Sequence, residues 1–428
     1  MNHLERRMGK GSVTNRSRKI GQGFTMLGTT LGLLYCVFVM GADLAQLRTL
    51  EEANRIFDLR KALESGGDDG EALYYRALVS ARFGDDVVAV AQLRHFLDTR
   101  QDREMQRKAH EELASVHVRT FRFGDAASEY AAALQLMFAG DAGRRDLEEK
   151  RVFCESLRDT PPQTVEFEKD VPVKARLQDS WIVPVNVNGK TAEWIFDTGA
   201  NFSVVTESEA ARIGLSIHDS SGIAIGSTGK RNSVRVAVAQ DMHFGAAHLR
   251  NVAFAVIADN TLPRQAPRGI LGFPVIRALG HVSISPKGVV RIAPGSTIPS
   301  GGPNLFFEGL TPIVEVRHGS HALQMVLDTG AGDSALYPAF RTSLSPEENA
   351  RLRKKDLRST GVGETVVGAV DIAPKLRLEL PGKAVDLISI SLQSQQPHEF
   401  RFEDGRIGMD ALAGGFTLDF RAMQLRLD

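Results

Sequence analysis

Two aspartates in the second half of the chain stand in nearly identical surroundings. The apolar run Trp194-Ile195-Phe196 leads into Asp197-Thr198-Gly199-Ala200, and Met325-Val326-Leu327 leads into Asp328-Thr329-Gly330-Ala331. An apolar strand would carry each carboxyl into a buried centre, and the glycine permits a tight turn after it. One such motif carries little weight, but two in shared context predict a pair of carboxylates that work together.

Further correspondences follow each aspartate in the same order. Ser203 and Ser334 come next, then Ser227-Thr228-Gly229 and Ser359-Thr360-Gly361, and finally Ile270-Leu271-Gly272 and Ile407-Gly408. An internal duplication explains all of these matches together.

Two carboxylates about 3 Å apart cannot both ionise cheaply, so one acts as a base while the other acts as an acid. Such a pair can activate a water molecule for attack on a carbonyl carbon without a covalent intermediate.

From these motifs the segment of about residues 165–428 resembles the aspartic peptidase superfamily, in the fused two-lobed form of its retropepsin-like branch. The resemblance implies that Asp197 and Asp328 share one proton and hold the attacking water. It implies that Thr198 and Thr329 brace the two turns, which Gly199, Ala200, Gly330 and Ala331 complete. An apolar-apolar-Gly segment should pack beside each turn; Ile270-Leu271-Gly272 fits, whereas Arg406-Ile407-Gly408 departs by one charged residue. No cofactor and no metal are implied.

Glycine-containing segments lie where this family places flaps over the substrate. The candidates are Ser227, Thr228 and Gly229 in the first half and Ser359, Thr360 and Gly361 in the second. The flap tyrosine of pepsin-type enzymes is absent, which favours the retropepsin-like branch. The alternative is that these glycines form ordinary hairpin turns with no closing motion.

Ala200 and Ala331 occupy positions where many family members have serine or threonine. A hydroxyl there could donate to the carboxylate and favour its charged form, whereas alanine cannot. We therefore expect the pair to keep its shared proton to a higher pH than a hydroxyl-bearing homologue would.

The elements around these motifs predict a multidomain chain. Residues 43–158 contain no proline and repeat apolar positions at helical spacing, which predicts an all-α domain of tetratricopeptide-like helical hairpins. The composition changes at Thr160-Pro161-Pro162, where this domain is expected to end. Arg82-Phe83-Gly84-Asp85 recurs as Arg122-Phe123-Gly124-Asp125, and each copy is expected between two helices. This domain is either a plain spacer or a groove for a protein partner.

Short runs rich in Val and Ile predict an all-β peptidase domain with lobe one at 159–300 and lobe two at 301–428. A linker rich in glycine and proline near residues 293–304 separates the lobes. Helices with capped N-termini are expected at Thr206, with Glu209 completing a capping box, and from Ser345 through Lys355.

Residues 1–42 combine a basic start with an apolar run from Phe24 to Ala42. This pattern predicts a membrane anchor or a signal sequence, with the rest of the chain outside the cytoplasm, in a periplasm-like compartment if the host is bacterial. An uncleaved anchor is favoured because the apolar run is long. Balanced charge, with 52 basic and 52 acidic residues, gives no reason to expect nucleic-acid binding.

The sequence therefore predicts an aspartic endopeptidase that acts on peptide or protein substrates. Two alternatives remain at this point. One is a catalytically silent peptide-binding module of the same fold, and the other is a helical-repeat scaffold in which the β lobes are passive.

Overall fold

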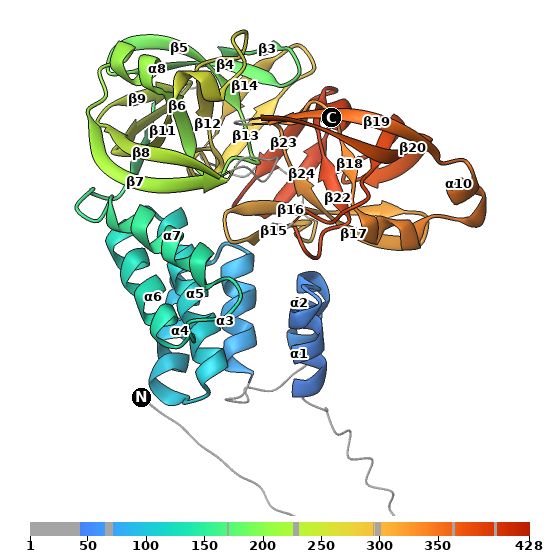
Figure 1. The fold of residues 1–428 in the computed structure, drawn as a ribbon, viewed down its shortest axis with the longest axis horizontal. Coiled ribbons are helices and arrows are strands. Elements are labelled where there is room, and N and C mark those ends of the chain that lie inside the picture. The colour runs from blue at the N-terminus through green and yellow to red at the C-terminus, as the bar shows by residue number, and fades with distance from the viewer. Residues whose placement is uncertain are drawn as a thin grey trace, which may run out of the picture. The chain divides into compact units, whose positions relative to one another are not determined.

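The structure is a computed structural model that describes residues 43–64, 72–168, 171–225, 231–293, 295, 301–361, 364–397 and 400–428. These residues belong to one compact unit, Met40–Asp428 (Figure 1). A helical region comes first and an all-β region with curled sheets follows, which confirms the predicted fold class. The proposed anchor lies outside the described residues, and none of the helices that are described is long and apolar enough to span a bilayer.

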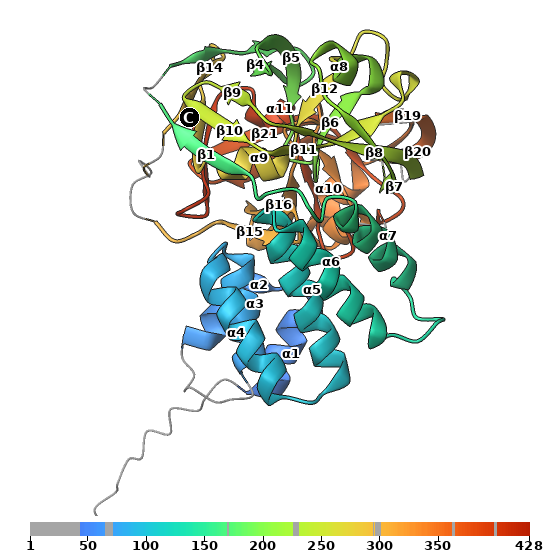
Figure 2. The same cartoon turned by 90° about the vertical axis from the view of Figure 1, so that its left-hand side faces the viewer.

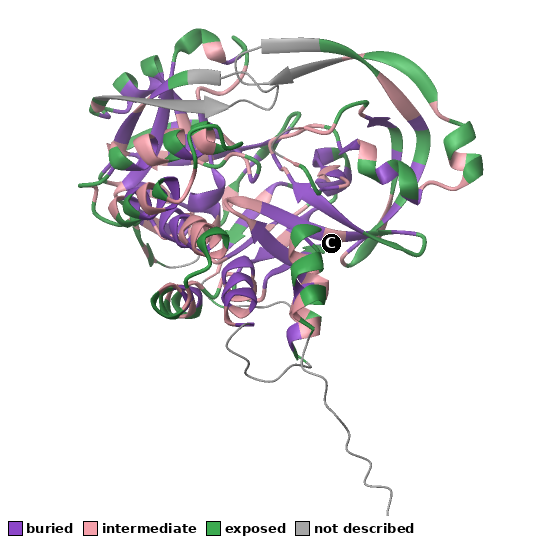
Figure 3. Ribbon diagram, turned by 60° about the horizontal axis from the view of Figure 1, so that its bottom comes forward, coloured by how far each residue is buried: buried purple, intermediate pink, exposed green. Residues whose placement is uncertain are grey.

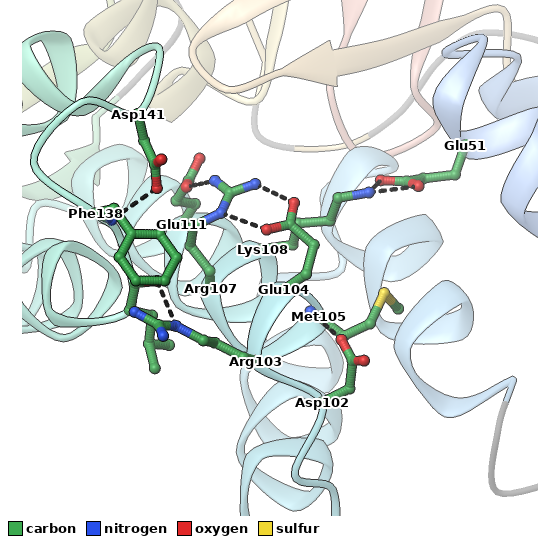
Figure 4. A network of polar contacts seen from close by, with 11 residues as sticks. Glu51, Asp102, Arg103, Glu104, Met105, Arg107, Lys108, Glu111, Phe138 and Asp141 are labelled. Atoms are coloured by element: carbon green, nitrogen blue, oxygen red, sulfur yellow. Dashed lines mark hydrogen bonds and ion pairs between the residues drawn. The ribbon is translucent and has the colours of Figure 1, made fainter.

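The helical region contains seven helices within the described residues. They are α1 (Leu44–Glu52), α2 (Ile56–Glu64), α3 (Leu73–Arg82), α4 (Asp86–Thr99), α5 (Arg103–Arg119), α6 (Phe123–Gln135) and α7 (Arg144–Glu155). Asp102 caps α5 by accepting from the backbone N–H of Met105. The polar face of α5 then carries ion pairs, including Lys108 Nζ to Glu51 Oε1 of α1 at 2.8 Å (Figure 4). The first and fifth helices are thus joined through side chains.

The repeat expected from Arg82-Phe83-Gly84-Asp85 is only partly correct. Its first copy does connect α3 to α4, with Gly84 in the left-handed region. In the second copy, Phe123 already begins α6, and Phe121 takes the left-handed position instead. The positions that match in structure are Arg82 and Arg119, which end α3 and α5 and are both buried. The alignment based on the repeated four-residue motif was wrong because the turn between two helices needs only one residue at positive φ, and that residue differs between the copies.

The helices are docked on lobe two by a buried arginine. Arg82 donates to the carbonyl of Phe307 at 3.1 Å, pairs with Glu112 of α5 at 2.7 Å and also pairs with Glu308. Phe306 and Ile313 of lobe two share a buried cluster with side chains of the helices. Figure 2 shows α3 beside β15, where these contacts lie. The helical region is therefore packed on the β region rather than tethered to it, and a partner groove remains a prediction.

Lobe one is built on an 11-stranded sheet in the order β1-β10-β9-β4-β5-β12-β6-β11-β8-β7, with β3 paired to β4. Its strands are β1 (Thr164–Phe167), β3 (Arg176–Leu177), β4 (Trp181–Val187), β5 (Lys190–Phe196), β6 (Ser203–Thr206), β7 (Ile217–Ile225), β8 (Arg231–Ala239), β9 (Met242–Phe244), β10 (Ala247–Arg250), β11 (Val252–Ile257) and β12 (Gly269–Leu271). Helices α8 (Glu207–Arg212) and α9 (Phe273–Ala278) and a 3₁₀ turn at Asp259–Thr261 complete it.

Lobe two is built on an eight-stranded sheet in the order β15-β16-β17-β22-β18-β21-β20-β19. Its strands are β15 (Leu305–Glu308), β16 (Thr311–His318), β17 (His321–Leu327), β18 (Ala335–Leu336), β19 (Arg353–Gly361), β20 (Glu364–Leu380), β21 (Lys383–Leu392) and β22 (Gly405–Ile407). Its helices are a 3₁₀ turn at Pro338–Ser343, α10 (Pro346–Ala350) and α11 (Met409–Leu412).

A third, five-stranded sheet joins the lobes in the order β2-β14-β13-β23-β24. Its strands are β2 (Val173–Lys174), β13 (His281–Ile284), β14 (Val289–Ile292), β23 (Phe416–Asp419) and β24 (Gln424–Leu427). The lobe-one strand β13 and the lobe-two strand β23 pair directly, from His281 opposite Asp419 to Ile284 opposite Phe416. Buried side chains from both lobes form one continuous cluster around this sheet (Figure 3). The shared sheet therefore fixes the register between the two lobes.

Two of the predicted helix starts are partly right. Ser345 and Glu348 form a capping box at α10, but the helix ends at Ala350 and Arg353 already begins β19. Thr206 caps α8 as expected, yet the carboxylate of Glu209 binds Trp194 Nε1 and Arg212 instead of closing a capping box. Each local motif identified where the helix begins. Tertiary contacts determined where α10 ends and which groups the carboxylate of Glu209 binds.

Candidate active site

The two Asp-Thr-Gly turns meet between the lobes, each at the end of an inner strand. β5 buries Trp194 and Phe196 and then delivers Asp197; β17 buries Val326 and Leu327 and then delivers Asp328. The aspartate backbones are held alike, because Asp197 N donates to Leu271 O and Asp328 N donates to Ile407 O, both at 3.0 Å. The duplication read from the sequence is thus repeated in the backbone.

The threonines of the two turns exchange hydrogen bonds across the lobe boundary. Thr198 Oγ1 donates to Leu327 O at 2.6 Å and accepts from Thr329 N at 3.0 Å. Thr329 Oγ1 donates to Phe196 O at 2.8 Å and accepts from Thr198 N at 3.0 Å. Both threonines are fully buried. These reciprocal hydrogen bonds, called the reciprocal lock below, fix the turns against each other.

The glycine of each turn makes room for the carboxyl of the other. A Cβ placed on Gly199 would lie 2.7 Å from Asp328 Cγ, and one on Gly330 would lie 2.3 Å from Asp197 Cγ. Real Cβ atoms do not approach other atoms so closely. Each carboxyl therefore lies directly against the opposite turn.

The segment after each active-site turn is also duplicated. β12 runs parallel to β5, and β22 runs parallel to β17. Gly272 N donates to Ser203 Oγ at 3.1 Å, and Gly408 N donates to Ser334 Oγ at 2.9 Å. These serines, picked out by spacing alone, thus secure the glycine that ends each neighbouring strand.

The electrostatics favour a single proton on the pair. Burial, followed by the charge of Asp328, raises the pKa of Asp197 well above its usual range, while backbone N–H donors from Gly199 and Ala200 oppose the shift. In lobe two, Gly330 N and Ala331 N donate to Asp328 Oδ1 at 3.0 and 3.1 Å. Asp328 Oδ2 faces Arg406, whose Nη1 lies 3.5 Å away. Two carboxyls with different charged surroundings are thereby placed side by side.

Arg406 is the site residue whose role the sequence did not reveal. Its departure from the apolar-apolar-Gly pattern was the visible signal, because a charged residue in the middle of a buried three-strand arrangement needs a partner. The structure gives it Asp328 as that partner, with side-chain exposures of 24% for the arginine and 16% for the aspartate.

Two hairpins belong to the regions where flaps were expected. β7 and β8 form one, up to Ile225 opposite Arg231, and the candidates Ser227, Thr228 and Gly229 lie outside the described residues. In lobe two, β19 and β20 pair up to Gly361 opposite Glu364, which places Ser359, Thr360 and Gly361 at the end of the ladder. The hairpins have the topology that flaps need; closing over a substrate remains a prediction.

One group among the described residues has side chains of metal-ligating type. Glu168, His243 and His248 each offer an atom within 4.8 Å of the others. The two histidines are cross-strand partners on β9 and β10, so their spacing in the sequence did not indicate that they lie together. Asp241 already binds His248 Nε2 at 2.8 Å and lies 3.5 Å from His243 Nε2. The imidazoles are thus partnered within the protein, on strands that do not carry the aspartate pair.

Comparison with known proteins gives a match to the part of the site that lies in lobe one. Residues 183–275, within lobe one, match the family model described as aspartyl protease. Among solved structures, a retropepsin-like aspartic protease from Rickettsia conorii is similar over 31% of this chain and 95% of its own, with 16% identity and a TM-score of 0.23. No curated protein matches the chain. Residues 183–275 are thus similar to the aspartyl protease family, which agrees with the motif around Asp197.

Proposed function

We propose that this protein is an aspartic endopeptidase in which Asp197 and Asp328 activate a water molecule. The observation that carries the proposal is the reciprocal lock of the two Asp-Thr-Gly turns, which holds the carboxyls together between the lobes. Keeping two carboxyls adjacent is costly when one of them is charged and partly buried. A silent binding module would gain nothing from that cost, so the geometry favours catalysis.

The reaction follows from one proton shared by two carboxyls. The ionised carboxylate takes a proton from water while the water oxygen bonds to the peptide carbonyl carbon. The carbonyl oxygen takes the proton of the other carboxyl, giving a tetrahedral diol. The diol then collapses: the first carboxyl protonates the leaving nitrogen, the C–N bond breaks, and the second carboxylate recovers its proton from a hydroxyl.

The test is hydrolysis of a diverse peptide library by the full chain, with cleavage sites mapped by mass spectrometry. We expect cleavage by the parent chain, and a loss of at least about a thousandfold in kcat/KM for Asp197→Asn and for Asp328→Asn, because each removes half of the acid and base pair. Circular dichroism of both variants controls for folding. Comparable cleavage by a folded single variant would refute the assignment of these residues, and a parent chain that binds but never cuts would favour the silent module.

We further propose that residues 1–42 anchor or export the chain, so that the lobes work outside the cytoplasm. The basic start and the long apolar run of the sequence support this. Fractionation of cells that express the full chain, with intact-mass measurement of the product, separates an anchor from a cleaved signal. Recovery of the uncleaved chain in the cytoplasmic fraction would contradict both.

A further inference from the structure

The lobes differ at one position directly beside the aspartate pair. In lobe one, Ile270 of β12 lies between Ile195 and Val204 in the sheet register. At the equivalent place in lobe two, Arg406 of β22 lies between Val326 and Ala335. An isoleucine in the strand beside the lobe-one turn thus corresponds to an arginine whose guanidinium lies next to Asp328.

Backbone N–H groups donate to both carboxyls. Gly199 N donates to Asp197 Oδ1 at 2.8 Å, and Gly330 N donates to Asp328 Oδ1 at 3.0 Å. Ala331 N adds a second hydrogen bond to Asp328 Oδ1 at 3.1 Å, and the backbone of Ala200 acts on Asp197 by lowering its pKa. Backbone donors thus act on both carboxyls, whereas the cation acts on Asp328 alone.

Apart from the ion pair with Asp328, the guanidinium of Arg406 makes few hydrogen bonds within the described residues. Its Nη2 lies 3.5 Å from the carbonyl oxygen of Asp333, and its Nε is buried without a hydrogen-bond partner in the described part of the chain. The ion pair with Asp328 is its only one within 4 Å among those residues. Arg406 thus lacks the full set of hydrogen bonds that a purely structural arginine would use.

The other charged groups around the site are acidic. Asp333 is exposed on the loop that follows the lobe-two turn, and Asp410 of α11 accepts from Ser334 N at 2.9 Å. Asp179, from the loop between β3 and β4 of lobe one, lies against Gly332. Negative charge from all three would favour protonation of the pair in general. Among the charged side chains named here, Arg406 is the one that favours an ionised carboxylate, in addition to the backbone donors.

We propose, on the basis of the proposed function, that Arg406 is a positioning residue that keeps Asp328 ionised and leaves the shared proton on Asp197. Asp328 is then the base that takes the proton of the attacking water, and Asp197 is the acid that protonates the peptide carbonyl oxygen. In a symmetric pair the two arrangements would be equally populated. Arg406 holds the pair in one of them, which also fixes the face from which water attacks.

The sign of the pH effect follows from the cation. Arg406 stabilises the singly ionised pair, so it lowers the pH at which the pair loses its first proton and sets the acid limb of the rate profile. Replacing it with the lobe-one residue removes that stabilisation. In Arg406→Ile the acid limb of kcat/KM should therefore move up by about one to two pH units. Arg406→Lys keeps the charge and should leave the limb within about half a unit of the parent.

The experiment compares pH profiles of kcat and KM for the parent, Arg406→Ile and Arg406→Lys on one neutral peptide and on one acidic peptide. Arg377→Ile is the matched control, because Arg377 is an exposed arginine of β20 that pairs with Asp386. A lower kcat in both Arg406 variants with unmoved limbs would overturn the proposal in favour of a structural role. Unmoved limbs with a raised KM for acidic peptides would overturn it in favour of substrate recognition.

A second measurement does not need hydrolysis. Carbon-13 NMR titration of aspartate carboxyls, assigned with Asp197→Asn and Asp328→Asn, reports the pair directly. The signal of Asp328 should titrate at higher pH in Arg406→Ile than in the parent, and an unchanged titration would overturn the proposal. If the shift is found while the parent cleaves nothing, the proposed function fails and the role of Arg406 in placing the proton stands.

Discussion

Lobe one and lobe two hold their aspartates with the same backbone and surround them with different side chains. The threonine lock, the strand beside each turn and the serine under each glycine correspond one to one. The difference lies at Ile270 and Arg406, one aliphatic and the other cationic. The comparison teaches that main-chain geometry makes a pair of carboxyls, whereas side chains decide how the two members differ.

The largest effect should come from filling the space that each turn leaves for the opposite carboxyl. Gly330→Ala would place a Cβ 2.3 Å from Asp197 Cγ, and Gly199→Ala would place one 2.7 Å from Asp328 Cγ. Each should lower kcat/KM at least about a hundredfold, because the carboxyl must move from its place. Gly368→Ala is the matched control, since a Cβ there meets nothing within 4 Å. If either variant keeps a tenth of the parent kcat/KM, the two turns do not constrain the opposite carboxyls equally, and the prediction is wrong.

The next effect concerns stability. Thr198→Ala and Thr329→Ala each remove a buried hydroxyl that donates to one backbone carbonyl and accepts from one backbone N–H. Each should lower the free energy of unfolding by about 2–4 kcal/mol, because buried polar groups lose their partners. The serine variants keep the hydroxyl and should lose far less.

Tryptophan fluorescence during urea unfolding is a sharp reporter of this effect. The two tryptophans of the chain, Trp181 and Trp194, are both buried in lobe one. If the lobes unfold together, Thr329→Ala in lobe two should shift the midpoint as much as Thr198→Ala does. A shift from Thr198→Ala alone would mean that the lobes unfold separately, against the shared sheet and the mutual lock.

The smallest effect should come from restoring a hydroxyl beside each carboxyl. Ala200→Ser would donate to ionised Asp197 and favour its charged form, which lowers the pH at which the second proton leaves. The upper limb of the rate profile should then move to lower pH by about half to one unit. Ala331→Ser acts on Asp328 and should lower the acid limb instead. If the upper limb of the Ala200→Ser and Ala331→Ser double variant stays in place, the hydrogen-bond argument is wrong while the peptidase assignment stands.

The aspartate turns could be predicted because their chemistry is local. An apolar strand, an acid and a turn glycine are neighbours in the chain, so Asp197, Asp328 and their flanking residues could be found by spacing alone. The sheet that joins the lobes could not, because β13 and β23 are separated by more than a hundred residues and pair only through the fold. The docking of Arg82 on lobe two was hidden for the same reason.

Two predictions from local sequence motifs were wrong because tertiary packing determined the structure there. The repeat placed Phe123 in a connection, yet helix α6 already begins there and Phe121 makes the turn. The helix from Ser345 was extended too far, since Arg353 pairs with Ile372 as a strand. In Arg406 the charged departure was visible in the sequence, but its partner Asp328 became known only from the structure.

The direct pairing of β13 with β23 has a consequence for how a two-lobed chain can change over time. When two identical chains supply one aspartate each, any new residue near the site appears twice, and an arginine beside one carboxyl brings a second arginine beside the other. Here the backbone ladder from His281 opposite Asp419 to Ile284 opposite Phe416 keeps the two halves in register within a single chain. Each half can then acquire its own substitutions while the other stays unaltered. After duplication, two initially identical aspartates could therefore come to have different roles.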